Sequence, residues 1–282
     1  MSRADWVART EEQVAARATF TNAIQQPLSG EARHELEATF ALRWGRGFLK
    51  CPGCSLVPSL CVCARVRGLS CTTPHRVHVL LHHDELGRGS NTGGLLAAAL
   101  GARLHVSGIR SHEAALAEAL SSAPAAAVLW PGDDAVPLHE FVAALPSGAL
   151  DAGVALVAVD GTWNGARKMV KRLPPGLPRL SLPPSAFSPG RSLLWPVRKY
   201  AGDRTERQCT YEAVVAALSG LGALDEETRQ QLLLCLKIKV DALLRFKTRR
   251  AAYANETLLP SSSPAVESAR GGALDRTEFA TP

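Results

Sequence analysis

The sequence predicts an α/β protein with a mainly parallel sheet flanked by helices and a small zinc-binding element of four cysteines. Two observations predict it. Short apolar runs of strand length alternate with Ala/Leu-rich helical runs after residue 72, and such alternation is typical of parallel sheets. Four of the seven cysteines fall between residues 51 and 63, which favours metal ligands over disulfides where no export signal is expected.

Changes in composition divide the 282 residues into four segments. Residues 1–46 are predicted to form a helical N-terminal extension, and residues 47–72 the four-cysteine element. Residues 73–252 carry the strand–helix alternation and are expected to be the principal domain. Residues 253–282 hold few large apolar side chains and are expected to be a disordered tail.

Each element within these segments has its own signal. The N-terminal helical region is broken at residues 27–30, where Ser29 or Gly30 would cap a second helix. Residues 173–196 contain seven prolines and are expected to be mainly loop. Apolar runs predict four strands, at residues 76–82, 103–107, 125–130 and 153–159. Periodic runs predict helices at residues 93–100, 111–121, 208–222 and 225–250.

The composition excludes several classes of protein. A hydrophobic content of 46% is ample for a core, so the chain is neither disordered nor a disulfide-stapled mini-protein. No run of 18 apolar residues is present, and no signal-peptide pattern opens the chain, so we expect no membrane partner and a cytoplasmic location. The basic residues at 245–250 leave a nuclear fraction open. The net charge of +6 permits a polyanionic partner.

The clustered cysteines have the spacing C-x2-C-x6-C-x-C. Four soft thiolates suit tetrahedral Zn²⁺, and a site with four protein ligands is closed and therefore structural rather than catalytic. Four reduced thiols without a metal are the alternative. A redox pair is less favoured, because no strand precedes a helix here. The expected zinc ligands are Cys51, Cys54, Cys61 and Cys63.

Unusual loops follow the predicted strands, at the sheet edge where open α/β proteins bind ligands. They comprise residues 82–94, 131–134 and 160–163, which are rich in Gly, small hydroxyls and carboxylates. This composition suits a polar ligand held by backbone amides. Neither a G-x-G-x-x-G motif nor a P-loop is present, so nucleotide binding of those kinds is not indicated. Asp160 fits either a helix cap or a catalytic group.

The last of these loops carries the D-x-T-W pattern at residues 160–163, and the chain here resembles the DTW-domain family. That family is similar to SPOUT-type methyltransferases and includes tRNA-uridine aminocarboxypropyltransferases. The resemblance covers roughly residues 45–250 and departs near 201–209, where Cys209 replaces the usual serine. It rests on the cysteine cluster and on Ser90–Gly93, Trp130–Gly132, Asp160–Trp163, Arg167–Met169, Arg198–Tyr200 and Thr210–Ala213, in that order.

The resemblance implies a SPOUT-like fold, which can be knotted, and a reaction. S-adenosylmethionine would give its 3-amino-3-carboxypropyl group to N3 of a tRNA uridine and leave as 5′-methylthioadenosine. Asp160 is the candidate base for the N3 proton, within the catalytic set Asp160, Thr162 and Trp163. Trp163 would form an apolar wall, stack on the target base, or belong to the core.

By the same resemblance, the cofactor would lie among three loops of the domain. Arg198 or Lys199 would hold the cofactor carboxylate or an RNA phosphate. Glu212 would orient the cofactor amino group or simply favour the first turn of its helix. The residues expected to bind the cofactor are Asn91, Thr92, Pro131, Gly132, Asp133, Asp160, Leu194, Arg198, Lys199 and Glu212.

Two basic stretches are candidates for holding RNA. Residues 237–250 contain six basic side chains, Lys239 among them, against one acidic residue, and residues 165–172 contain four more. Such patches attract phosphates without reading bases, and the alternative is an ordinary solvated helix face. The expected RNA-binding residues are Arg167, Lys168, Lys171, Arg172, Lys237, Arg245, Lys247, Arg249 and Arg250.

Other functions remain open at this point. The same fold and cofactor would serve an aminocarboxypropyltransferase acting on ribosomal RNA or a conventional RNA methyltransferase. A zinc-stabilised RNA-binding module without activity is the alternative outside enzymes. By resemblance, the cysteine cluster favours a tRNA partner, and the intact D-x-T-W motif favours an active enzyme. The oligomeric state has no signal in the sequence.

Overall fold

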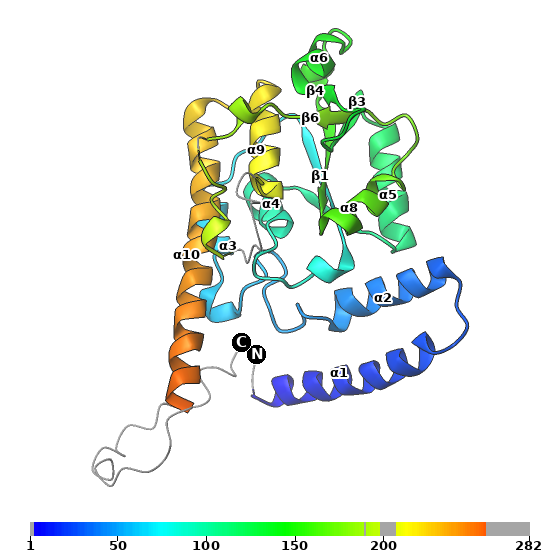
Figure 1. The fold of residues 1–282 in the computed structure, drawn as a ribbon, viewed down its shortest axis with the longest axis vertical. Helices are drawn as coiled ribbons and strands as arrows, with labels where there is room; N and C mark the ends of the chain where they lie inside the picture. The colour runs from blue at the N-terminus through cyan, green and yellow to red at the C-terminus, as the bar shows by residue number, and fades with distance from the viewer. Residues whose placement is uncertain (1–2, 189, 198–206, 258–282) are drawn as a thin grey trace.

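A six-stranded, wholly parallel sheet forms the centre of the protein (Figure 1). The computed structural model describes residues 3–188, 190–197 and 207–257. The strand order is β2-β1-β5-β3-β6-β4, so the predicted α/β class with a mainly parallel sheet is confirmed. The strands are β1 (Arg76–Leu81), β2 (Arg103–Val106), β3 (Ala125–Leu129), β4 (Val136–Pro137), β5 (Val154–Asp160) and β6 (Arg179–Ser181).

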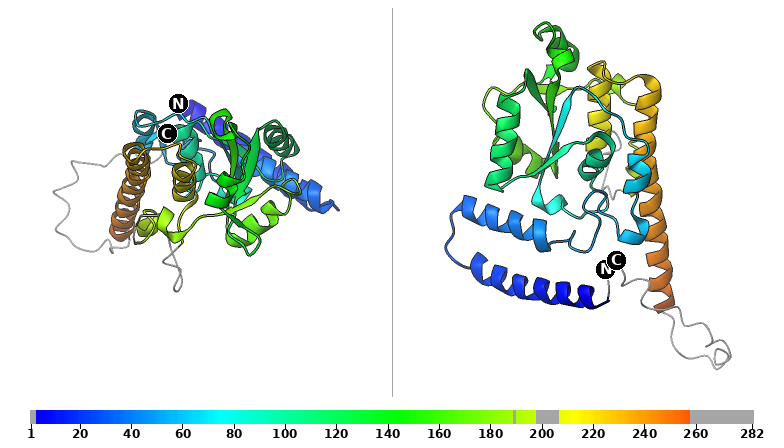
Figure 2. Two further views of the ribbon diagram at one scale, coloured as in Figure 1. Left: turned by 90° about the horizontal axis from the view of Figure 1, so that it is seen from above. Right: turned by 180° about the vertical axis from the view of Figure 1, so that it is seen from behind.

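Helices cover both faces of this sheet (Figures 1 and 2). The first five helices are α1 (Arg3–Ile24), α2 (Gly30–Trp44), α3 (Cys63–Arg67), α4 (Gly93–Leu100) and α5 (Arg110–Ser121). The others are α6 (Leu138–Ala143), α7 (Ala149–Ala152), α8 (Trp163–Val170), α9 (Thr210–Gly220) and α10 (Glu226–Thr257). Short 3-10 turns are η1 (Pro58–Leu60), η2 (His83–Glu85), η3 (Pro184–Ala186) and η4 (Trp195–Val197).

The larger core lies on the face covered by α4 and α9, with α3 and α10 packed outside them. Leu95 and Leu96 of α4 and Val214 of α9 are fully buried against strands β1 and β5. Alternate residues of a strand point to opposite faces. Asp160, the last residue of β5, follows Leu156 and Ala158 in this alternation and therefore faces the larger core.

The smaller core lies on the face covered by α5 and α8. Leu116 and Leu120 of α5 and Met169 of α8 pack there against the opposite sides of β1, β3 and β5. His78 of β1 and His105 of β2 are buried among the polar residues of the sheet, with His78 Nδ1 3.1 Å from His105 Nε2.

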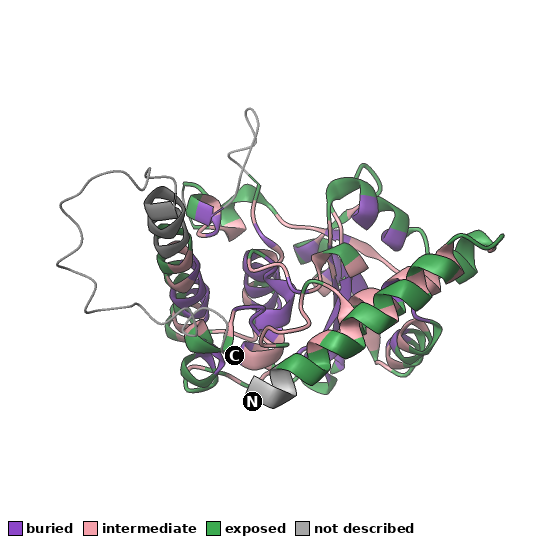
Figure 3. Cartoon of the chain, turned by 90° about the horizontal axis from the view of Figure 1, so that it is seen from below, coloured by how far each residue is buried: buried purple, intermediate pink, exposed green. Residues whose placement is uncertain are grey.

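Helices α1 and α2 form a hairpin next to the carboxyl edge of the sheet (Figure 1). Of the two predicted caps, Ser29 and Gly30, it is Ser29 that caps α2, by accepting a hydrogen bond from Ala32 N. Ala38 of α2 is buried in a small cluster with Val106 and Ile109. Helix α1 packs on α2 and is exposed over most of its described length (Figure 3).

The structure also departs from the sequence prediction in places. Residues 173–196 are mainly loop, as expected, but they also contain strand β6, which pairs with β3 and β4. Helix α10 ends at Thr257, beyond the predicted start of the tail at 253; residues 258–282 lie outside the described part. None of the helices in the described part combines the length and apolar character needed to cross a membrane.

Candidate functional site

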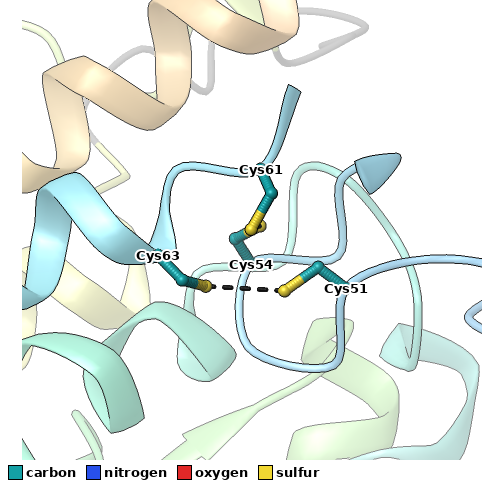
Figure 4. A group of neighbouring side chains, drawn as sticks. All are labelled: Cys51, Cys54, Cys61 and Cys63. Carbon is teal, nitrogen blue, oxygen red and sulfur yellow. Dashed lines mark hydrogen bonds between the residues drawn. The ribbon is translucent and has the colours of Figure 1, made fainter. Parts of the chain in front are cut away.

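The four clustered cysteines converge in space before α3 (Figure 4). All four Sγ atoms lie within 4.8 Å of one another. Cys51 Sγ is 3.5 Å from Cys63 Sγ, and Cys54 Sγ is 3.7 Å from Cys61 Sγ. Four sulfurs at zinc–sulfur bond length on a tetrahedron are about 3.8 Å apart. The donor set therefore fits a four-coordinate zinc ion, which is the metal that the spacing predicts.

The surroundings favour the thiolate form at one of the four cysteines, Cys51. All four cysteines are free thiols, and Cys54 and Cys63 are buried. Burial alone would raise the pKa of Cys51, yet the backbone N–H of Cys54 and neighbouring thiols lower that pKa to about 7. Backbone N–H donors thus favour the ligand-competent form of Cys51, whereas burial raises the pKa of Cys61 and Cys63, which would lose their protons on binding a metal.

Asp160 ends the central strand β5 and is buried beneath the loops of the carboxyl edge. Its Oδ2 accepts hydrogen bonds from Asn91 Nδ2 at 2.7 Å and from Gly93 N at 2.9 Å. Its Oδ1 accepts one from Thr210 Oγ1 at 3.1 Å. The carboxylate thus joins three segments that are far apart in the sequence: the loop before α4, the end of β5 and the start of α9.

Two opposing effects act on the Asp160 carboxyl group. Burial, the larger one, raises its pKa above the ordinary value. The hydrogen bonds from Gly93 and Thr210, the charge of Lys239 and the hydrogen bond from Asn91 act against this rise. The result is a carboxylate held in one orientation that accepts a proton more readily than an exposed aspartate.

Asn91 organises the loop that approaches Asp160. Its amide nitrogen donates to Asp160, and its Oδ1 accepts from Gly94 N at 3.1 Å, which caps the start of α4. Its backbone carbonyl accepts a short hydrogen bond from Lys239 Nζ. The neighbouring Thr92 is buried, and its Oγ1 accepts from Tyr211 N at 3.4 Å. The predicted residues Asn91 and Thr92 are therefore beside Asp160.

The D-x-T-W motif begins at the end of β5 and continues into the start of α8. Thr162 is the N-cap of α8, with Oγ1 accepting from Gly165 N at 3.3 Å. The interpretation of Asp160 as the cap of this helix is therefore wrong. Trp163 is 40% exposed and stands edge-on to Trp130, with ring centroids 4.9 Å apart, so a core role for it is wrong as well. Arg207 lies over the Trp163 ring, 5.5 Å from its centroid.

Glu212 holds the start of α9 and the segment before η4 together. Its Oε2 accepts from Cys209 N at 3.0 Å and from the Ser192 hydroxyl, and its Oε1 accepts from Leu193 N at 2.8 Å. The adjacent Leu194 is buried. Both carboxylate oxygens of Glu212 have hydrogen-bond partners within the chain, and these partners show that Glu212 caps the start of α9. A contact of Glu212 with a cofactor stays a prediction.

The other predicted cofactor residues are less tightly placed. Pro131, Gly132 and Asp133 follow β3 and are exposed, next to Trp130. Arg198 and Lys199 lie outside the described residues. The structure thus brings Asn91 into contact with Asp160, with Thr92 next to it. Glu212 lies two residues after Thr210, which bonds Asp160, and the loop after β3 is exposed to solvent.

Three residues at this site were not singled out from the sequence. Gly93 and Thr210 bond the Asp160 carboxylate directly, and Lys239 bonds Asn91. Lys239 was counted within a basic run, and that interpretation is wrong because its side chain is fully buried. A signal was present: Leu232, Leu236 and Leu243 place Lys239 on the apolar stripe of a helix.

The remaining basic residues divide into exposed and engaged groups. Arg172 Nη1 contacts His34 Nδ1 at 2.7 Å, and Lys247 Nζ donates to Val197 O at 2.8 Å, so both side chains are tied to the fold. The side chains of Arg249 and Arg250 lie outside the described part. The exposed candidates are Arg167, Lys168 and Lys171 at α8, and Lys237 and Arg245 on α10.

Together these features define a parallel α/β protein with a four-cysteine centre and a buried carboxylate at the carboxyl edge of its sheet. The chain belongs to the DTW-domain family, whose family model matches residues 49–244. Comparison with curated proteins and with solved structures finds no match. Membership of the DTW family is consistent with a tRNA-modifying enzyme and is associated with transferase activity.

Proposed function

We propose that this protein is a tRNA-uridine aminocarboxypropyltransferase, which moves the 3-amino-3-carboxypropyl group of S-adenosylmethionine to N3 of a tRNA uridine. Membership of the DTW family supports a transferase that modifies tRNA. The observation that carries the proposal at the site is the buried Asp160 carboxylate, whose pKa burial raises, at the carboxyl edge of the sheet.

The reaction is a substitution at the carbon that joins the aminocarboxypropyl chain to sulfur. Uridine N3 forms a bond to this carbon while the carbon–sulfur bond breaks. The bonding pair stays on sulfur, so the cationic sulfonium leaves as neutral 5′-methylthioadenosine. Because three carbons are attached to sulfur, the one that reacts is the one held in line with N3. The N3 proton must pass to a base before or during attack.

Asp160 is the proposed acceptor of this proton. Its raised pKa brings the carboxyl group closer to the pH at which a base works well. Its hydrogen bonds to Asn91 and Thr210 fix the orientation of both oxygens. Proton uptake by the carboxylate also offsets part of the cost of burying its charge, since burial disfavours the ionised form.

The exposed aromatic pair is the proposed platform for the target base. Trp163 offers an exposed ring three residues from Asp160, and Trp130 supports that ring edge-on. Stacking of a base on an aromatic ring does not depend on sequence and contributes about 1–3 kcal/mol. The exposed Arg167 and Lys168 on the next turn of α8 would bind the adjacent phosphates.

A double-label experiment tests the reaction. The protein is incubated with tRNA and with S-adenosylmethionine labelled either in the methyl group or in the carboxyl group. We expect the carboxyl label, and not the methyl label, to enter RNA. Methyl label in RNA would instead establish a methyltransferase, and absence of both would favour a binding module. Label in ribosomal RNA but not in tRNA would identify ribosomal RNA as the substrate in place of tRNA.

A matched pair of variants tests the base. Asp160→Asn keeps the size of the side chain, one oxygen that accepts from Asn91 and Gly93, and a hydrogen-bonding group for Thr210. We expect kcat to fall by about 10²–10⁴ while the variant remains folded at the assay temperature. Asp151→Asn, which changes an exposed carboxylate on α7, is the control and should leave kcat unchanged. Retained turnover in Asp160→Asn would remove Asp160 as the base.

A further inference from the structure

Lys239 is a fully buried lysine in the outer layer of the larger core. It lies on α10 between Leu236 and Leu243, both of which are buried. Moving an ammonium group out of water is costly unless other charges and hydrogen bonds compensate. Burial lowers the pKa of Lys239 to about 8, so the group still carries its charge at neutral pH. Its surroundings must therefore supply the compensation.

The thiols of the four-cysteine cluster and the Asp160 carboxyl group both act electrostatically on this ammonium group. The thiol groups of Cys54 and Cys63 act on Lys239 and raise its pKa, as do Asp160 and the Cys209 thiol. Lys239 in turn lowers the pKa of Asp160. Four thiolates around Zn²⁺ carry a formal charge of about −2. Lys239 is thus a cation that interacts electrostatically with both the four-cysteine centre and the candidate base.

Hydrogen bonds and backbone contact connect the same two sites. Lys239 Nζ donates to the carbonyl of Asn91, whose side chain donates to Asp160 Oδ2. The turn between Cys51 and Cys54 lies against the start of α4, since a Cβ on Gly94 would approach Gly53 O to 2.7 Å. The loop that orients Asp160 therefore contacts both the four-cysteine turn and Lys239.

We propose that Lys239 is a positioning residue that couples the zinc centre to Asp160. Its charge offsets the negative charge of the zinc–thiolate group, and its hydrogen bond holds the Asn91 loop against the Asp160 carboxylate. The zinc centre then contributes to the geometry of the site as well as to folding. The catalytic part of this inference rests on the proposed function; the electrostatic part does not.

The test follows the Asp160 carboxyl group directly, in full-length zinc-loaded protein carrying ¹³C-labelled aspartate side chains. Asp160→Asn assigns the Asp160 carbon signal. Lys239→Met removes the charge and the donor, so we expect the pKa of Asp160 to rise by about one unit. Lys239→Arg keeps the cation and should restore most of that difference. Glu85 of η2 also interacts electrostatically with Asp160 and is common to all variants.

The second readout is the rate of zinc loss to a chelator. We expect Lys239→Met to release zinc roughly tenfold faster, a change typical of losing an outer partner of metal ligands, and Lys239→Arg to stay near wild type. Lys237→Met removes an exposed lysine two residues away on the same helix and is the control for both readouts. If Lys239→Met does not fold, Lys239→Gln, which keeps a donor without the charge, replaces it.

The outcomes separate this inference from the proposed reaction. A shifted Asp160 titration together with faster zinc loss supports the coupling, whichever group the enzyme transfers. Wild-type behaviour of Lys239→Met in both readouts would overturn it, and so would a change in only one, because a single ammonium group is proposed to serve both sites. Given aminocarboxypropyl transfer, Lys239→Met should lower kcat more than it raises KM, with the acid limb of the pH profile moved upward.

Discussion

The two faces of the sheet bury polar groups in opposite ways. On the face covered by α4 and α9, Asp160 and Lys239 compensate each other's charge through Asn91. The buried polar pair of β1 and β2, His78 and His105, has no opposite charge in contact among the described residues. Burial there lowers the pKa of His78 to about 4, with further lowering by His105. One set of groups remains charged because its partners are charged, whereas the other remains neutral.

This difference indicates where the structure is specialised. A neutral histidine pair needs hydrogen-bond partners for its ring nitrogens but no opposite charge. A buried carboxylate and ammonium remain favourable only while both are present, because removal of one leaves the other uncompensated. The face that carries the candidate site should therefore be the more sensitive to single substitutions, and the other face the more sensitive to acid.

The largest expected effect comes from removing the Asp160 side chain. Asp160→Ala leaves three donors without an acceptor and Lys239 without its carboxylate, so we expect the free energy of unfolding to fall by about 3–5 kcal/mol. Asp160→Asn, which retains an acceptor and a donor, should cost less than half as much. Denaturant unfolding at pH 7 measures both. A loss below about 1 kcal/mol for Asp160→Ala would contradict the greater sensitivity that we expect of the face with the candidate site.

The neutral histidine predicts a specific response to acid. His78 gains a proton near pH 6.5 in the unfolded chain but only near 4 in the folded protein, so the unfolded state binds more protons as the pH falls. Stability is therefore full above pH 6.5 and declines towards pH 4, with a loss from this residue of about 2 kcal/mol by pH 4.5. Unfolding free energies at pH 7 and pH 4.5 should differ by that much less in His78→Leu than in wild type.

Burial also lowers the pKa of His75, His82 and His105, so these histidines add to the same acid response. The prediction concerns only the part removed with His78. An identical pH dependence in His78→Leu and wild type would show that His78 takes up its proton at the same pH in the folded and unfolded states, so that this face also accommodates a charged group in acid.

The sequence predicted those parts of the site that depend on residues close together along the chain. The spacing of four cysteines predicted their convergence, and a strand end in the D-x-T-W motif predicted the place of Asp160, because parallel strands bring their carboxyl ends to one edge. Strands and helices with clear periodicity were also predicted, and α4 matches its predicted bounds of 93–100.

The missed features depend on contacts between distant segments. Lys239 was taken for a surface residue because its charge outweighed its place on an apolar stripe; its partners come from Asn91 and the cysteine turn, which no local pattern brings near α10. The engagement of Arg172 with α2 is of the same kind. Strand β6 was missed because three residues give too short a pattern to detect.

Gly93 tests the sensitivity of the α4 and α9 face with an expected stability effect of intermediate size. Gly93 N donates to Asp160, and a Cβ at this position would lie 2.5 Å from Asp160 Oδ2 and 2.8 Å from Val79 Cγ1. We expect Gly93→Ala to lower the free energy of unfolding by about 1–3 kcal/mol through overpacking and to disturb the carboxylate. Gly30→Ala, in a helix and with nothing within 4 Å, is the matched control and should be neutral or slightly stabilising. Equal stability of the two variants would mean that the Gly93 loop moves aside without loss.

The smallest expected effects compare the two faces as surfaces for RNA. Helix α8 packs with the α5 face and α10 with the α9 face, and each carries exposed basic residues. If tRNA crosses the carboxyl edge between them, Arg167→Glu and Arg245→Glu should each weaken binding about three- to tenfold and reduce the slope of log affinity against log salt by roughly one. Filter binding or anisotropy at several salt concentrations measures this.

The position of the aromatic platform makes the two variants unequal. Arg167 follows Trp163 by about one turn of α8, so a phosphate next to the stacked base would be bound there, whereas Arg245 would contact RNA further from the target. We therefore expect Arg167→Glu to lower kcat/KM for tRNA more than Arg245→Glu at equal loss of binding. The reverse order would place the target base towards α10 and would argue against Trp163 as its stacking partner, because a base stacked on α8 depends most on the phosphate contacts nearest to it.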